Sequence, residues 1–292
     1  MIISLITIEK AAWFFDVESY AENLRATTDN LSLEDSMKNA LKYYKGIATK
    51  ISFLCVGIWW ILFSQIAFYF LKDTKTNNKA GSKMFTQGFA ELGKVWSKAK
   101  EMPTLKGFLS SFFFYSMGVQ AIMVLAPLFG KEELKMESGK LIATVLLLQI
   151  IAIPGAYLFA WISKVKGNKV SILIMLILWV GICFGAYFVE TDTQFYVLAG
   201  FVGAIMGGIQ SLSRSTYSKI LPENTKDTAS YFSFYDVTEK MAIVIGTATF
   251  GFVESLTSMR DSALALSVYF IIGLILLIRT KMPFLKEENK KM

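Results

Sequence analysis

The chain has 292 residues and a net charge of +7, and 54% of its residues are hydrophobic while only 18% are charged. Soluble domains carry about 25% charged residues, so this composition favours a membrane protein over a soluble globule. The sequence contains no histidine, which excludes histidine metal sites, Ser-His-Asp triads and histidine proton relays.

Six apolar runs are long enough to cross a bilayer, which takes about 20 mostly apolar residues in a helix. They cover 51–71, 108–129, 141–162, 170–189, 195–212 and 261–278. A seventh run, from about 231 to 253, is apolar but carries three charges in its first half. The apolar opening, 1–8, is too short to cross, and we interpret it as the remnant of a transmembrane helix. The pattern predicts an all-α integral membrane protein.

The segments between these runs differ in their content of Lys and Arg, with nineteen on one side and ten on the other. The positive-inside rule therefore places the linker 72–105 and the tail 281–292 in the cytoplasm, and makes 9–50 an extracytoplasmic loop. We expect a multi-pass protein of the cell inner (cytoplasmic) membrane, surrounded by the lipid bilayer. Nucleic-acid binding needs a basic face on a soluble domain, so no nucleic-acid partner is expected.

Within the linker, four apolar residues recur at helical spacing opposite two lysines: Phe85, Phe89, Leu92 and Trp96, against Lys94 and Lys98. This spacing predicts an amphipathic helix. It either lies on an anionic leaflet or is an ordinary solvated linker helix.

The seventh run contains Asp236, Glu239 and Lys240, and a charge in the bilayer core costs roughly 2.5–3.5 kcal/mol on insertion scales. Asp236 and Lys240 are four residues apart on one helix face, so we expect them to pair. Glu239 is then the surplus charge, and we interpret it as a site for a coupling proton or for a cationic group of a substrate. The alternative is a structural network in helical turns that are still near the headgroups.

Three glutamines, Gln120, Gln149 and Gln210, lie inside apolar runs. Lipid offers an amide no partner, so these side chains should face the interior of the bundle, where they bind substrate or tie helices together. Arg214 lies at the cytoplasmic end of its run, where it either snorkels to the interface, pairs with a loop residue or takes part in gating.

Small residues are spaced for close helix packing at Gly203 and Gly207 and again at Gly181 and Gly185. Pro154, followed by Gly155, lies well inside its run and is expected to kink the helix.

Several stretches resemble the major facilitator transporters of the unknown major facilitator family, which is related to the autophagy-associated vacuolar effluxers. They are GGIQSLSRSTYSKILPE (207–223), SYFSFYDVTEKMAIVIGTATFG (230–251), VGIWWILFSQIAFYFL (56–71), FFFYSMGVQAIMVLAPLFGKEEL (112–134) and IAIPGAYLFAWISK (151–164). The resemblance covers nearly the whole chain.

The resemblance implies a twelve-helix fold of two six-helix halves. On that map, 51–71 is the sixth span, 72–105 is the central cytoplasmic linker, and 106–280 is the six-helix C-terminal half. The stretch 1–8 would end the fifth span, so we expect an N-terminally truncated chain whose missing N-terminal half is a partner.

The sequence departs from the family at the turn that many facilitators build as Gly-x-Leu-Ala-Asp-Arg-x-Gly-Arg-Lys. The matching residues here are Ala160, Ile162, Ser163, Lys164, Val165, Gly167, Asn168 and Lys169. Lys164 stands where the family has an acidic residue of a cytoplasmic charge lock, so we expect either that the gating pair is altered or that this copy is under relaxed constraint.

The resemblance therefore implies a secondary active transporter that moves a small polar solute by alternating access. An amino acid is the expected solute and a proton the expected coupling ion. The alternatives are a non-transporting membrane fragment or scaffold from a truncated transporter gene, and a receptor. An enzyme is not expected, because the sequence has no carboxylate–histidine pair, no metal ligand set and no phosphate-binding loop. No catalytic residue, metal or cofactor is therefore predicted.

Overall fold

The structure is a computed structural model that describes residues 7–8, 10–28, 32–70, 84–222 and 228–282. The chain divides into two compact units, Met1–Lys79 and Ala80–Met292, and each is described by itself. Most of the predicted helix remnant at 1–8 and most of the tail at 281–292 lie outside the described residues.

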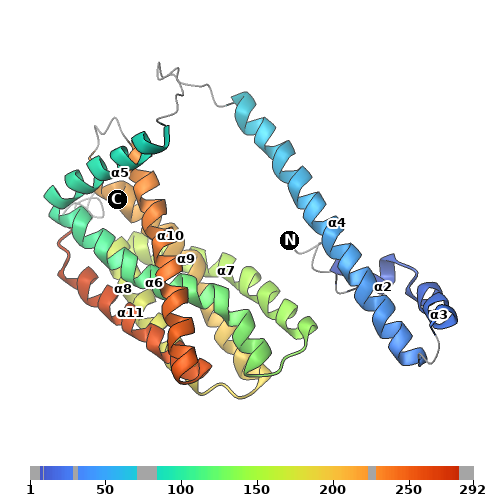
Figure 1. Ribbon diagram of the computed structural model, residues 1–292. Coiled ribbons are helices and arrows are strands. Elements are labelled where there is room, and N and C mark those ends of the chain that lie inside the picture. Colours follow the sequence, from blue (N-terminus) through green and yellow to red (C-terminus); the bar gives the residue numbers. More distant parts are fainter. Residues whose placement is uncertain (1–6, 9, 29–31, 71–83, 223–227, 283–292) are drawn as a thin grey trace. The chain divides into compact units, whose positions relative to one another are not determined.

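The first unit contains α2 (Ala11–Phe14), α3 (Val17–Thr27) and the long α4 (Leu33–Phe70) (Figure 1). Asp16 caps α3 by accepting a hydrogen bond from the Ser19 amide at 3.1 Å. The two longer helices bury Val17 and Ala21 against Ala40. The apolar half of α4 is exposed in this unit, as the large side chains of Phe53 and Trp60 show.

The described part of 9–50, predicted to be a loop, is mainly helical. The helix that contains the apolar run 51–70 begins at Leu33. The reason is amphipathicity: Ser36, Ala40 and Ala48 are buried while most of the polar residues between them stay exposed. A polar composition is compatible with a solvated helix as well as with a loop. The extracytoplasmic position of this segment stays a prediction.

The second unit is a bundle of seven helices in the described residues (Figure 1). They are α5 (Met84–Glu101), α6 (Pro103–Glu132), α7 (Ser138–Lys166), α8 (Asn168–Tyr187), α9 (Asp192–Ile220), α10 (Thr228–Leu256) and α11 (Met259–Arg279). The described residues of the predicted apolar runs all lie within helices except 188–189, and residue 71 lies outside the described residues.

Six helices of the described chain are long and apolar enough to cross a membrane: α4, α6, α7, α8, α9 and α11. Helix α10 is also long, with 29 residues, but its charges keep it out of this set. The prediction of an all-α, multi-pass membrane protein is confirmed.

Glycines let pairs of helices approach until their backbones touch. A Cβ atom on Gly203 of α9 would lie 2.5 Å from the Leu148 carbonyl oxygen of α7, and one on Gly155 of α7 would overlap the Ala204 carbonyl oxygen of α9. Gly207 meets the Ala152 carbonyl oxygen in the same way, at 2.7 Å. The predicted packing role of Gly203 and Gly207 is therefore confirmed, and α7 continues as a helix through Pro154.

The second predicted glycine pair behaves differently. A Cβ atom on Gly185 would meet Leu198 at 3.1 Å, but one on Gly181 would meet nothing within 4 Å. The predicted packing role of Gly181 is therefore wrong for this bundle, because no neighbouring helix comes close to the position of its missing side chain.

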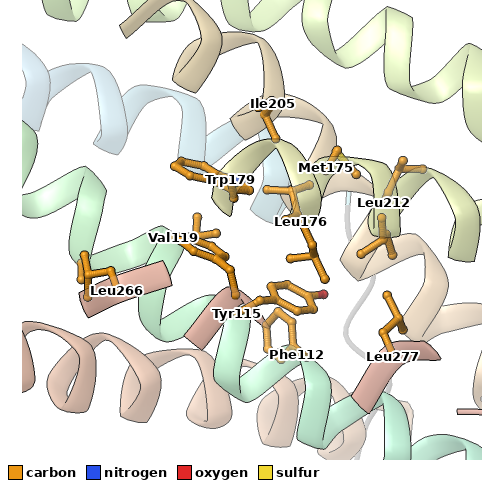
Figure 2. Close-up of a cluster of buried hydrophobic side chains, with 14 of the residues drawn as sticks. Phe112, Tyr115, Val119, Met175, Leu176, Trp179, Ile205, Leu212, Leu266 and Leu277 are labelled. Carbon is orange, nitrogen blue, oxygen red and sulfur yellow. The ribbon is translucent and has the colours of Figure 1, made fainter. Parts of the chain in front are cut away.

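The core of the bundle is a cluster of buried side chains to which α5 to α11 all contribute, and the side chains labelled in Figure 2 come from α6, α8, α9 and α11. Trp179 of α8 is fully buried and stacks on Phe270 of α11, with 5.2 Å between ring centroids and 6° between ring planes. Tyr115 of α6 and Ile205 of α9 are buried in the same cluster. Neighbouring helices are thus joined through their side chains as well as through glycine contacts.

Ionic contacts join the ends of several helices. Lys140 in the first turn of α7 pairs with Asp192 in the first turn of α9, with 2.5 Å between Nζ and Oδ2. Arg260 at the start of α11 donates to Glu133 at 3.2 Å and to the Tyr187 carbonyl at 2.9 Å.

We expect Gly155→Ala to destabilise the second unit, because the added methyl group overlaps the α9 backbone and forces α7 and α9 apart. Overpacking of this kind costs about 1–3 kcal/mol. The matched control is Gly181→Ala, which adds the same group in open space and should leave stability unchanged or slightly raised. Thermal unfolding of the purified chain in detergent measures both. Equal melting temperatures for the two variants would contradict the packing role of Gly155.

Candidate functional site

A cavity of about 190 Å³ lies between α6, α9 and α10. Its lining combines aromatic, amide, hydroxyl and charged side chains. The lining residues are Phe112, Tyr115, Ser116, Val119, Gln120, Ile209, Gln210, Ser213, Arg214, Tyr235 and Glu239.

Helical spacing explains why these residues share one cavity. The α6 residues recur at intervals of three and four along one face, and Tyr235 and Glu239 are one turn apart on α10. Tyr115, Ser116, Ser213 and Tyr235 were not predicted as site residues. Stepping three or four residues along each helix from Gln120, Gln210 or Glu239 would have found Ser116, Ser213 and Tyr235 but not Tyr115, which is five residues from Gln120.

Gln120 and Glu239 form the central polar contact of the cavity. The amide Nε2 of Gln120 donates to the Glu239 Oε1 at 2.8 Å, and both residues are half-buried. A charge-assisted hydrogen bond of this kind holds the carboxylate in place inside the bundle. The side chain that was interpreted as the surplus charge therefore has an amide partner and still lines open space.

A second polar contact lies on another wall, where the hydroxyl groups of Tyr115 and Ser213 are 2.6 Å apart. Both residues are buried. Phe112 stacks on Tyr235 with ring centroids 4.2 Å apart. The cavity thus combines hydroxyl groups, amides and a carboxylate with aromatic surfaces.

The expected ion pair between Asp236 and Lys240 is not formed. Asp236 instead pairs with Arg214 of α9, with 2.5 Å between Oδ1 and Nη2. The spacing argument found a possible partner only on the same helix, whereas the bundle brings Arg214 closer. The Arg214 guanidinium also lies over the rings of Phe232 and Tyr235, at 5.8 and 5.7 Å from their centroids.

The structure brings together four of the predicted site residues and separates the others. Gln120, Gln210, Arg214 and Glu239 line the cavity, and Asp236 joins them through Arg214. Gln149 is half-buried on α7 and does not line this cavity. Lys240 is exposed on α10 outside it.

Neutral groups join the turn between α7 and α8 to α9. Lys164 stands in the last turn of α7, at the position where many facilitators have an acidic residue. Ser163 donates to the Asn168 Oδ1 at 2.5 Å, and Asn168 Nδ2 donates to the Thr216 hydroxyl at 3.0 Å. All three residues are buried, while Lys164 is exposed. Gly167 gives the turn its positive φ of 89°, which favours glycine.

Within the residues that the structure describes, no group of three or more Cys, Asp or Glu side chains is placed to hold a metal ion. The side chains that line the cavity offer hydrogen bonding, charge pairing and aromatic contact.

The sequence of the chain matches a known protein family and several curated proteins. A family model described as "Vacuole effluxer Atg22 like" matches residues 34–290. An uncharacterized MFS-type transporter of Bacillus subtilis, YxiO, is 27% identical over 243 residues, which are 83% of this chain and 55% of the relative.

Fungal proteins match as well. Autophagy-related protein 22 of Yarrowia lipolytica is 27% identical over 263 residues, which are 78% of this chain and 44% of the relative. The Saccharomyces cerevisiae protein of that name is 24% identical over 262 residues, which are 78% of this chain and 48% of the relative. The chain spans about half the length of the curated relatives it matches.

We expect a double-mutant cycle to detect coupling between Arg214 and Asp236 and none between Lys240 and Asp236. The single variants are Arg214→Gln, Lys240→Met and Asp236→Asn, and unfolding in detergent gives the free energies. Both side chains of the pair are about half exposed, so the coupling should be about 0.2–1 kcal/mol. A larger coupling for Lys240 than for Arg214 would restore the pair expected from spacing.

Proposed function

The chain belongs to the family of Atg22-like vacuole effluxers, and from this we propose that it forms one wall of a secondary transporter's solute pathway. Its α6–α11 bundle is of the major-facilitator type. In that architecture a small polar solute moves by alternating access, through a site near the bilayer midplane between two halves. The second half would be supplied by a longer form of this chain or by another polypeptide.

The observation that carries the proposal is the cavity between α6, α9 and α10. Gln120 lies in the middle of α6, and its hydrogen bond to Glu239 joins two helices at the cavity wall. Buried polar groups inside a membrane bundle are costly, so a cluster that also lines open space favours a solute site over helix attachment alone.

We propose an amino acid as the solute, because the cavity offers complementary groups to a zwitterion. Arg214 supplies a guanidinium for a carboxylate, and Glu239 supplies a carboxylate for an ammonium group. Gln120, Gln210 and the paired hydroxyls of Tyr115 and Ser213 supply neutral hydrogen-bonding groups.

Transport is tested by counterflow in proteoliposomes that contain this chain together with the second half, either as a longer form of the chain or as a co-reconstituted polypeptide, and that are loaded with unlabelled amino acids. We expect labelled amino acid to accumulate above the level in empty liposomes, and Gln120→Ala to reduce it. Protease protection must show that the chain is inserted. Inserted protein without counterflow would overturn the proposal and favour the alternative of a non-transporting membrane scaffold.

We further propose a proton as the coupling ion, carried by Glu239, with the Arg214–Asp236 pair as a gating contact. Glu239→Gln keeps the shape and the hydrogen-bonding capacity of the side chain but cannot exchange a proton. It should abolish uptake driven by a pH gradient while counterflow continues. The matched control is Glu254→Gln on the same helix, which should leave both unchanged. Unchanged pH-driven uptake in Glu239→Gln would remove Glu239 from this role.

We propose that the chain lies in the cytoplasmic membrane with its C-terminus in the cytoplasm, on the basis of its Lys and Arg distribution. In a variant lacking Cys55 and Cys183, an impermeant maleimide should label Lys131→Cys in intact cells. It should label Lys164→Cys only after permeabilisation. The opposite pattern would reverse the topology.

A further inference from the structure

A larger groove, of about 490 Å³, lies between α5 and the first turns of α10, away from the site cavity. Gly88, Phe89, Glu91 and Leu92 line it from α5, and Ser230, Ser233 and Val237 line it from α10. Its volume lies in the range of small-ligand pockets. None of its lining residues lines the cavity between α6, α9 and α10.

Packing of α5 against the bundle fixes one wall of the groove. Val95 and Ala99 are buried, and the Trp96 ring stacks on Phe234 of α10 with 5.8 Å between centroids. Phe89 nevertheless remains 75% exposed on the groove side of the helix. The predicted amphipathic helix is therefore only partly covered, since α5 keeps an exposed apolar surface beside the groove. The side chain of Phe85 lies outside the described residues.

Helix α10 carries a cation next to this apolar surface. Lys240 is one turn beyond Val237 on the helix face that also bears Ser233, and it is exposed. Within the part of the chain that the structure describes, Lys240 forms no hydrogen bond or ion pair. Helical side chains lean toward the helix N-terminus, so the stem of Lys240 is directed back toward the groove.

On the other wall, α5 has its basic groups in fixed contacts. Lys94 pairs with Glu91 at 2.7 Å, which neutralises the acidic residue that lines the groove. Lys100 lies over the Trp96 ring, 5.1 Å from its centroid. Among the described residues that line the groove, the one acidic group is therefore paired, and the ammonium group of Lys240 lies next to the groove without an acidic partner in the described part of the chain.

We propose that this groove binds an anionic phospholipid, whose acyl chain lies along Phe89, Leu92 and Val237 and whose phosphate contacts Lys240. An amphipathic helix beside the first turns of a long apolar helix is where headgroups meet hydrocarbon, so lipid has direct access. The Ser230 and Ser233 hydroxyls can donate to ester or phosphate oxygens. Charge complementarity selects an anionic lipid over a zwitterionic one, and attraction to Lys and Arg near the surface is worth about 1 kcal/mol each. The inference does not depend on transport activity.

The test uses the purified full chain in neutral detergent, with phosphatidylglycerol or phosphatidylcholine added. Lipid retention is measured by native mass spectrometry and stabilisation by thermal unfolding. Phosphatidylglycerol should be retained in preference to phosphatidylcholine, and Lys240→Met should weaken its binding about fivefold. Lys164→Met, which removes an exposed lysine at the α7–α8 turn, is the matched control and should bind as the unaltered chain does.

Two further arms make the outcome decisive. Ser233→Trp fills the groove without changing charge and should abolish the preference for phosphatidylglycerol. Glycerol phosphate, which carries the anion without acyl chains, should not displace the lipid. The proposal would be overturned if Lys240→Met and Lys164→Met weakened phosphatidylglycerol binding equally, or if both lipids were retained equally. Full displacement of the lipid by glycerol phosphate would overturn it as well.

Discussion

The bundle depends on direct contact between helix backbones, because a bilayer gives helices no hydrophobic drive to associate. Gly155 and Gly203 make this contact between α7 and α9, and Gly246 makes it between α10 and the Met117 carbonyl of α6. These contacts set the distance between α7 and α9 and the distance between α6 and α10, and the site cavity lies where α9 faces α6 and α10. The polar contacts of the cavity, such as Gln120 with Glu239, add specificity to an arrangement that small residues have already set.

The sequence predicts the spanning helices well, because bilayer thickness sets the length of each apolar run and composition alone reveals it. It predicts their ends poorly where a helix continues into water. Helix α4 begins at Leu33, although its apolar part begins near 51, and its polar half buries only a narrow face that includes Ala40 and Ala48. The difference is one of solvent: a helix in water needs one apolar stripe, whereas a helix in lipid is apolar all round.

The sequence predicts which kinds of residue form the candidate site, but it does not predict all of its members. Depth along a helix can be read from sequence, so Gln120 and Glu239 were identified as intramembrane polar residues. The rotation of each helix about its own axis cannot be read from the sequence. For this reason Gln149 is predicted together with Gln120 and Gln210, although it does not line their cavity. The same limit explains Asp236, whose partner on α9 is invisible to a rule that considers spacing on one helix. Conversely, Tyr115 and Ser213 are not predicted from sequence, because a hydroxyl group in an apolar run is a weaker signal than an amide or a charge.

Different kinds of interaction hold the two ends of the α7–α9 pair together. At one end, the ion pair between Lys140 and Asp192 is partly exposed, so dissolved ions screen it. At the other end, the buried hydrogen bonds of Ser163, Asn168 and Thr216 carry no net charge and are not screened. Rising ionic strength therefore loosens only the first end. A pair of helices joined in this way has one end that is sensitive to salt and one that is not. The salt concentration on the side of the Lys140–Asp192 pair therefore affects the contact between α7 and α9 more than the salt concentration on the opposite side does.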